Sequence, residues 1–231
     1  MTDGASDRRW LDAAARLASS ALGSTGAAPT VGALVVDPGR QLLFGRAATP
    51  PRGSDPAELL ALSEARGMTE GRTLYVTLEP AAHYTSHAPI TDAILEFGIG
   101  RVVAGMLDPD PQRAGQGLAA LAEAGIEAVH LDHAPSRLLN EGYTTRITKG
   151  RPFVTLKLSL SADGMVGYAA PGSDTLLGAE ALRFIERERA AADAILSGAA
   201  RAEIEDNDLR IHLDGLEGRG ALRVILAGAR D

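Results

Sequence analysis

Residues 73–83 read Thr73-Leu74-Tyr75-Val76-Thr77-Leu78-Glu79-Pro80-Ala81-Ala82-His83, an apolar run that stops at an acidic residue and a proline. A short apolar run of this kind predicts a buried strand over 73–78. Segments with helical spacing of apolar residues lie on both sides of it along the chain, and further strand-like runs flank those segments. The strand at 73–78 is therefore expected to be one member of an alternating series of helices and strands.

The series can be followed outward in both directions. It predicts helices at 10–22, 56–66, 91–97 and 118–124, and strands at 31–36, 41–44, 73–78, 101–106 and 128–131. Strands that alternate with helices pair in parallel wherever a helix forms the crossover, and the helices cover both faces of the sheet. The first domain is thus predicted to be a three-layer α/β sandwich.

The alternation breaks around Asn140 to Pro152. A new strand is predicted from Phe153 to Leu160, and Asp163-Gly164 is expected to form a hairpin turn into Met165 and Val166. A helix at 179–192 and strands at 194–196 and 223–226 follow. We place the domain boundary near Gly150, which gives domains of residues 1–149 and 150–231, the second of them thin for an independent core.

Composition excludes several classes of protein. Lysine and arginine total 23 against 30 acidic residues, a net charge of -7, and no basic block is present, so nucleic acid is not an expected partner. There are no cysteines, which rules out disulfides, iron-sulfur clusters and thiolate zinc sites. No apolar run approaches the roughly 18 residues of a membrane span, and no signal peptide is apparent, so we expect a cytoplasmic protein.

Three separated segments carry a family resemblance: residues 77–83 quoted above, the Asp-Pro-Asp-Pro at 108–111, and Gly150-Arg-Pro-Phe-Val-Thr-Leu-Lys157. In this order they resemble the bifunctional deaminase-reductase of riboflavin biosynthesis, and the match runs through nearly the whole chain. The resemblance implies a cytidine-deaminase-like sandwich followed by a dihydrofolate-reductase-like α/β domain. It also implies zinc in the first domain, NADPH in the second and a phosphoribosyl pyrimidine as the small-molecule substrate.

The zinc ligands that the family requires are missing. Zinc deamination uses a metal-bound water held by one His and two Cys, with a Glu that moves protons. The ligand positions read Pro56, Ala81 and Ile90 here, and the family's substrate-side Asn falls on Ala28, whereas the Glu is kept as Glu58. We therefore expect neither bound zinc nor zinc-dependent deamination.

Glu58 has two interpretations. It is a relic of the catalytic position, or it caps a helix. In the second case Asp55 is the N-cap, Pro56 the first helical residue, and the Glu58 carboxylate reaches back in a capping box. We favour the cap.

A replacement metal site is a separate possibility. His83 and His87 are four residues apart, which on a helix would place both imidazoles on one face, and Glu79 or Asp92 could complete a site. The Thr, Ser and Pro residues around the two histidines favour a loop instead, so we favour no replacement metal.

The resemblance also assigns positions in the second domain. Lys157 and Asp163 fall on catalytic reductase positions, Ser161 and Gly198 on cofactor positions, and Arg183 on a position that meets the substrate. For Asp163 the alternative, a residue demanded by the tight turn, is the one we favour. For Arg183 a phosphoribosyl contact and a solvated helix face with neighbouring glutamates stay equally open.

The second domain departs from the family pattern as well. At the position where the family has a Thr that helps to hold the cofactor, this chain has Arg201, and where the family has a Trp near the substrate it has Thr175. The chain also reaches Asp231 before the glycine-rich segment with which the family binds the NADPH phosphates. We therefore expect an incomplete, partial reductase-like domain. Its open sheet edge predicts a homodimer.

Three functions remain open from the sequence. The hypothesis carried forward is a family member that has lost zinc-dependent deamination, with residual NADPH-dependent reduction of 5-amino-6-(5-phosphoribosylamino)uracil at the positions named above. The alternatives are a non-catalytic scaffold or binding pseudoenzyme, and a truncated relic of the family. Fold resemblance alone does not establish activity.

Overall fold

The structure is a computed structural model that describes residues 4–51, 55–84, 87–165, 177–199, 211–216 and 219–227. Its helices are α1 (Gly4–Ser19), α2 (Ala57–Glu64), α3 (Ile90–Glu96), α4 (Gln116–Glu123), α5 (Ala134–Leu139), α6 (Glu141–Lys149) and α7 (Ala179–Ala191). Its strands are β1 (Gly32–Asp37), β2 (Leu42–Ala48), β3 (Thr73–Val76), β4 (Arg101–Ala104), β5 (Glu127–His130), β6 (Ala194–Gly198) and β7 (Leu222–Leu226). The chain divides into two compact units, Met1–Phe153 and Val154–Asp231.

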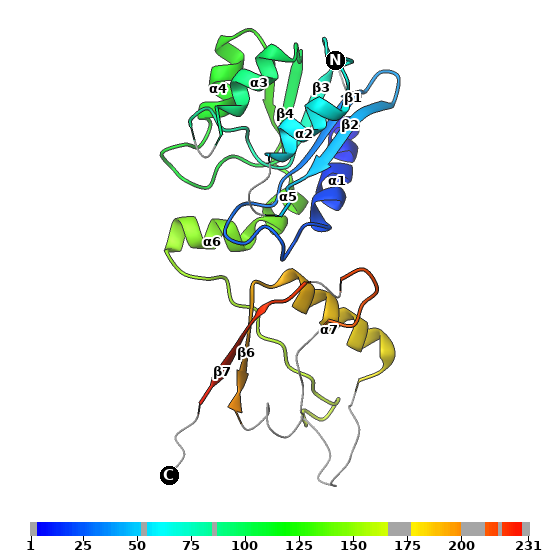
Figure 1. The fold of residues 1–231 in the computed structure, drawn as a ribbon, viewed down its shortest axis with the longest axis vertical. Coiled ribbons are helices and arrows are strands. Elements are labelled where there is room, and N and C mark those ends of the chain that lie inside the picture. The colour runs from blue at the N-terminus through cyan, green and yellow to red at the C-terminus, as the bar shows by residue number, and fades with distance from the viewer. Residues whose placement is uncertain are drawn as a thin grey trace. The chain divides into compact units, whose positions relative to one another are not determined.

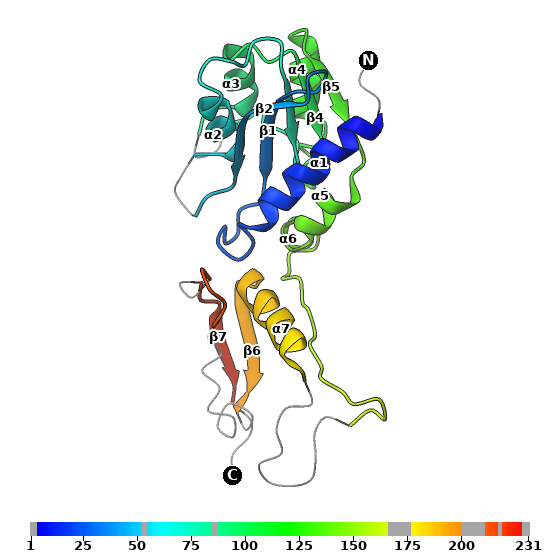
Figure 2. The ribbon, with the colours of Figure 1, turned by 90° about the vertical axis from the view of Figure 1, so that its right-hand side faces the viewer.

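The first unit is built on a five-stranded sheet in the order β2-β1-β3-β4-β5. β1 pairs antiparallel with β2 and β3, whereas β3, β4 and β5 pair in parallel and are connected through α3 and α4. Helices α2, α3 and α4 cover one face and α1 and α5 the other, as Figures 1 and 2 show. The predicted three-layer α/β sandwich is confirmed.

Alternation along the strands supplies a core on each side of this sheet. Along β1, Ala33 and Val35 join the cluster beneath α2, α3 and α4, whereas Leu34 and Val36 join the cluster beneath α1. Because successive side chains of a strand point to opposite faces, one apolar run serves both layers. This explains why the central strands are apolar at nearly every position.

A buried polar network fixes α1 to the sheet. Asp7 accepts hydrogen bonds from both Arg101 Nη atoms, each at 2.9 Å, and from the Tyr75 hydroxyl at 2.7 Å. The hydrogen bonds to Asp7 raise the pKa of Arg101, while burial and the same carboxylate raise the pKa of Tyr75. Asp7 is 4% exposed, so this carboxylate depends on its two partners for charge and hydrogen-bond compensation.

The sequence patterns did not predict two short helices: α5, just before the stretch where the alternation breaks, and α6 within it. Asn140, between them, is buried and anchors the pair: its side chain accepts a hydrogen bond from Thr30 N at 2.8 Å and donates to Thr30 O at 3.1 Å. Gly150 ends α6 with a positive φ of 63°, a conformation that glycine adopts without strain. Short helices held by such a distant contact lack the long apolar periodicity that reveals a helix in a sequence.

The second unit contains a two-stranded parallel sheet, β6 and β7, and the helix α7. The prediction of a strand over 153–160 is wrong, because residues 152–160 are not in a strand. The apolar residues of this segment are exposed: Val154, Leu156, Leu158 and Leu160. An alternating pattern makes a strand only where a neighbouring strand completes its backbone hydrogen bonds, and no described strand pairs with this segment. Within the described ranges, no helix is long and apolar enough to cross a membrane.

Candidate functional site

Of the three positions aligned with zinc ligands, two lie at the starts of α2 and α3, and Ala81 lies in the loop that follows β3. Pro56 directly precedes α2, and Ile90 is the first residue of α3. Ile90 N donates a hydrogen bond to Ala81 O at 2.8 Å, so the fold brings Ala81 and Ile90 together as a ligand pair would need. A pyrrolidine ring, a methyl group and a buried aliphatic side chain offer no nitrogen, sulfur or oxygen donor, so these residues do not fit a zinc ion.

Glu58 is not the helix cap that we favoured. The first intrahelical bond runs from Leu60 N to Pro56 O at 3.1 Å, which makes Pro56 the N-cap, and no side chain caps this end. Asp55 instead lies 3.7 Å from His87 Nε2. Glu58 is 5% exposed, and burial raises its pKa to about 7. The sequence motif allowed a capping box, but the structure shows no side-chain cap and buries Glu58 within α2.

Glu79 is a structural anchor and is not available as a metal ligand. Its carboxylate is buried and accepts hydrogen bonds from the backbone N–H groups of Asp108, Gly115, Gly117 and Leu118, at 2.8–3.2 Å. Three of these donors lie at the start of α4, where a negative charge is favoured by the helix dipole. Gly117 packs so closely that a Cβ there would lie 1.9 Å from Pro80 O. The 108–118 loop is therefore fixed against the end of the 73–78 segment.

The two histidines considered for a replacement metal are not joined to a ligand set. His83 lines a shallow hollow formed with residues 79–82, Asp108, Arg113, Gln116 and Gly117, whereas His87 faces Asp55. Asp92 is exposed on α3. In the part of the chain that the structure describes, which omits residues 85 and 86, no group of three His, Asp or Glu side chains is placed to hold a metal.

A further polar cluster, absent from the sequence analysis, joins α1 to α5. His133 Nδ1 lies 2.9 Å from Ser136 Oγ, and His133 Nε2 lies 3.0 Å from Asp12 Oδ1. This arrangement has the order of a nucleophile, a base and an orienting acid. Ser136, however, is completely buried and its Oγ fills the space beside Gly105, so no substrate can reach it and the cluster is structural.

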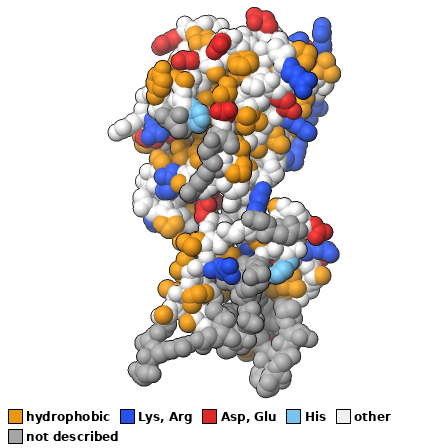
Figure 3. Space-filling view, in the orientation of Figure 1, with side chains coloured by type: hydrophobic (Ala, Val, Ile, Leu, Met, Phe, Trp, Pro, Cys, Tyr) orange, Lys and Arg blue, Asp and Glu red, His pale blue; other side chains and the backbone are white. Residues whose placement is uncertain are grey.

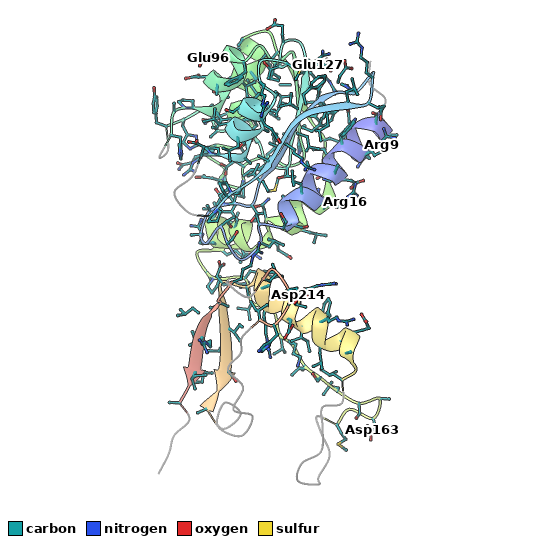
Figure 4. All side chains as sticks on the ribbon, turned by 45° about the vertical axis from the view of Figure 1, so that its right-hand side comes forward. Arg9, Arg16, Glu96, Glu127, Asp163 and Asp214 are labelled. Atoms are coloured by element: carbon teal, nitrogen blue, oxygen red, sulfur yellow. The ribbon has the colours of Figure 1, made fainter. Side chains whose placement is uncertain are left out.

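The positions assigned to the reductase lie on separate parts of the second unit. Two of them contact each other: the Ser161 hydroxyl donates a hydrogen bond to the Asp163 carboxylate, which lowers the pKa of Asp163. Both belong to a turn in which Gly164 N donates to Ser161 O at 2.9 Å and Gly164 has a φ of 83°. Figure 4 labels Asp163 in this exposed turn. A turn is therefore present at Asp163-Gly164, but residues 152–160 before it form no strand, so the predicted hairpin is not formed there, and Val166 lies outside the described residues.

The remaining reductase positions are on regular elements or before them. Arg183, on α7, forms an ion pair with Glu180 at 2.6 Å, and Lys157 is exposed in the irregular segment before the turn. Gly198 ends β6, and a Cβ built there would meet no atom within 4 Å. Thr175 and Arg201 lie outside the described residues.

Comparison with known proteins identifies the family. The profile of the cytidine and deoxycytidylate deaminase zinc-binding region matches residues 5–106. The riboflavin biosynthesis protein RibD of Aquifex aeolicus is 36% identical over 221 residues, which is 95% of this chain and 61% of that protein. The chain belongs to the riboflavin-biosynthesis deaminase-reductase family.

Other members of this family agree in sequence and structure. Escherichia coli RibD is 35% identical over 91% of this chain and 57% of its own length. The Thermotoga maritima structure named as a diaminohydroxyphosphoribosylaminopyrimidine deaminase/5-amino-6-(5-phosphoribosylamino)uracil reductase has a TM-score of 0.84 at 35% identity, over 96% of this chain and 63% of that one. Acinetobacter baumannii RibD gives the same TM-score at 31% identity. The chain spans about three-fifths of the length of these relatives.

Proposed function

We propose that this riboflavin-family protein does not carry out zinc-dependent deamination, and that its deaminase-like unit is a non-catalytic scaffold. The observation that carries the proposal is the set Pro56, Ala81 and Ile90 at the ligand positions, in a chain without cysteine. The first unit nevertheless keeps a complete three-layer core. A well-packed fold with no metal donors is what a structural role requires.

The residues that remain cannot replace the metal. Bound zinc supplies a hydroxide at neutral pH by lowering the pKa of water. Glu58, with its pKa raised to about 7 by burial, can hold or accept a proton but cannot by itself generate that nucleophile. His83 and His87 have no third donor among the described residues. Proton transfer without an activated water does not deaminate a pyrimidine.

The test combines metal analysis with restoration of the ligands. The purified protein, exposed to excess zinc and desalted, is expected to retain far less than one equivalent and to release no ammonia from diaminohydroxyphosphoribosylaminopyrimidine phosphate. The triple variant Pro56→His, Ala81→Cys, Ile90→Cys is expected to retain about one equivalent, since a three-ligand zinc site is then present. The same triple variant with Ala28→Cys in place of Ala81→Cys is the control. One tightly held zinc in the unmodified protein, or deamination by it, would contradict the proposal.

NADPH-dependent reduction of 5-amino-6-(5-phosphoribosylamino)uracil is the second candidate. It is favoured by the length of the match, since 95% of this chain aligns with a RibD protein and the alignment therefore extends into the second unit. The residues concerned are Lys157 and Asp163 for catalysis, Ser161 and Gly198 for the cofactor, and Arg183 for the substrate.

Calorimetry decides between the two candidates for the second unit. Saturable NADPH binding in the micromolar range, equivalent to about 8 kcal/mol, that is weakened in Ser161→Ala would support the reductase. Absence of binding by a protein that melts cooperatively would leave the scaffold.

A cytoplasmic location, a homodimer formed through the open sheet edge and a lack of nucleic-acid binding remain part of this proposal. Light scattering measures the oligomeric state.

A further inference from the structure

The same dipeptide occurs in two described turns of the second unit, as Asp163-Gly164 and as Asp214-Gly215. Both aspartates are exposed, and both glycines have a positive φ, 83° for Gly164 and 80° for Gly215. Figure 3 shows acidic side chains at the surface of this unit, and Figure 4 labels the two aspartates in separate turns. The two copies differ in their hydrogen bonds.

An Asp-Gly dipeptide can rearrange without any cofactor. The backbone nitrogen of the glycine attacks Cγ of the protonated aspartate, and the amide proton and the carboxyl hydroxyl leave as water, which closes a succinimide ring. A second water then opens the ring at either carbonyl. Opening at the former backbone carbonyl gives isoaspartate, in which the main chain runs through the side chain. Glycine assists the attack because it has no Cβ and its backbone turns easily.

The Asp163-Gly164 dipeptide is held away from this reaction by Ser161. Gly164 N, the attacking atom, donates its proton in a hydrogen bond to Ser161 O at 2.9 Å, and the Ser161 hydroxyl donates to the Asp163 carboxylate. The second hydrogen bond lowers the pKa of Asp163, so less of the protonated carboxyl group is present to be attacked. Both reacting groups are therefore engaged within the turn.

The Asp214-Gly215 dipeptide has no such restraint. Its turn is closed by a hydrogen bond from Leu216 N to Leu213 O at 2.9 Å, which spans the dipeptide without using its polar atoms. Among the described residues, neither the Asp214 carboxylate nor Gly215 N–H has a hydrogen-bond partner. A Cβ built on Gly215 would meet no atom within 4 Å, so the turn has open space in which to rearrange.

We infer that Asp214-Gly215 is a site at which this protein forms isoaspartate, and that Ser161 protects the matching dipeptide at Asp163. The product has one more methylene in the main chain, between the buried Ile211 and β7. It also carries a free carboxylate on the Cα of residue 214. This internal α-carboxylate is the group that an isoaspartyl carboxyl methyltransferase esterifies, so the modified turn is a substrate of that class of enzyme.

The experiment compares the two dipeptides in one sample of the whole chain. The folded protein is incubated at mildly acidic pH, and isoaspartate is measured in the tryptic peptides 158–183 and 211–219 by chromatography with mass spectrometry. Product is expected to accumulate several times faster in 211–219. In guanidinium chloride, where neither turn is formed, the two peptides should accumulate it at similar rates. Methyl transfer from S-adenosylmethionine by an isoaspartyl methyltransferase confirms the chemical identity of the product.

Two substitutions locate the cause. Asp214→Glu keeps the charge but would need a larger ring, so it should abolish the product in 211–219. Ser161→Ala frees the Asp163 carboxylate and should raise the product in 158–183 without changing 211–219. Circular dichroism melts check that both variants fold.

Three outcomes overturn the inference. The first is equal or faster reaction at Asp163 in the folded protein, and the second is no product at Asp214 when the unfolded chain forms it. The third is an unchanged rate at Asp163 in Ser161→Ala, which removes the protective role. None of these outcomes depends on zinc or on NADPH, so they are independent of the proposed function.

Discussion

Leu74 and Leu196 occupy comparable places in the two units, since each lies within a strand that pairs in parallel with a neighbour. Leu74 is completely buried, whereas Leu196 is 62% exposed. The first unit covers its parallel strands with helices on both faces, whereas in the second unit every residue of β7 and Leu196 of β6 are exposed. The contrast teaches that similar strand sequences contribute very different stability, because the covering layers decide how much apolar surface leaves water.

The largest expected effect is in the buried network of the first unit. Asp7→Ala leaves Arg101 and the Tyr75 hydroxyl without their shared acceptor and is expected to cost about 4 kcal/mol of unfolding free energy. Urea unfolding followed by Trp10 fluorescence measures it, since Trp10 is the only tryptophan and lies 6.2 Å from Tyr75 between ring centroids. The control is Glu127→Ala, which removes the other, 65% exposed partner of Arg101 and should cost less than about 1 kcal/mol. Equal losses of unfolding free energy in the two variants would contradict the prediction that the buried partner of Arg101 contributes more than the exposed one.

A pair of leucine truncations tests the comparison directly. Leu74→Ala opens a cavity in the first core and is expected to cost about 3.5 kcal/mol, again by urea unfolding with Trp10 fluorescence. Leu196→Ala should change the opening free energy of β6 and β7, measured by hydrogen exchange, by less than about 1 kcal/mol, since most of that side chain is already in water. A large loss at Leu196 would mean that this side chain is covered in solution.

Glu58 gives the first unit a pH dependence. Its pKa is about 7 in the folded protein and near 4 in an unfolded chain. The free energy of unfolding is therefore highest below pH 4, where Glu58 is protonated in both states, and part of it is lost as the pH rises through about 7. Glu58→Gln removes this loss, because the amide stays neutral. The variant is expected to equal the wild type at pH 4 and to exceed it by up to about 3 kcal/mol at pH 8. Urea titrations across this range that run parallel for the two proteins would contradict the assignment.

The smallest effects come from glycines. In Gly45→Ala the new Cβ would lie 2.0 Å from Ala61 O, and the overpacking should cost about 2 kcal/mol. In Gly198→Ala the Cβ would meet nothing within 4 Å, so the change should stay within about 0.5 kcal/mol. Thermal melts for the first and hydrogen exchange for the second measure these changes. A strong destabilisation by Gly198→Ala would reveal a close neighbour at the end of β6.

Patterns in the sequence predicted the first unit well, because its strands and most of its helices have local signals. The run at 73–78 and the apolar periodicity of 10–22 each bury a face whatever lies far away along the chain. The patterns failed where structure depends on distant contacts. Asn140 holds α5 and α6 through Thr30, which lies 110 residues away in the chain, and 153–160 has the alternation of a strand but no described partner.

The sequence by itself determined that the ligand positions hold Pro56, Ala81 and Ile90, because metal binding requires donor atoms that a side chain either has or lacks. Tertiary structure decided what the surviving acidic residues do. Glu58 is a buried acid and not a cap, and Glu79 is fully used by four backbone amides. Burial and hydrogen-bond partners come from several distant segments at once, and for that reason no local pattern encodes them.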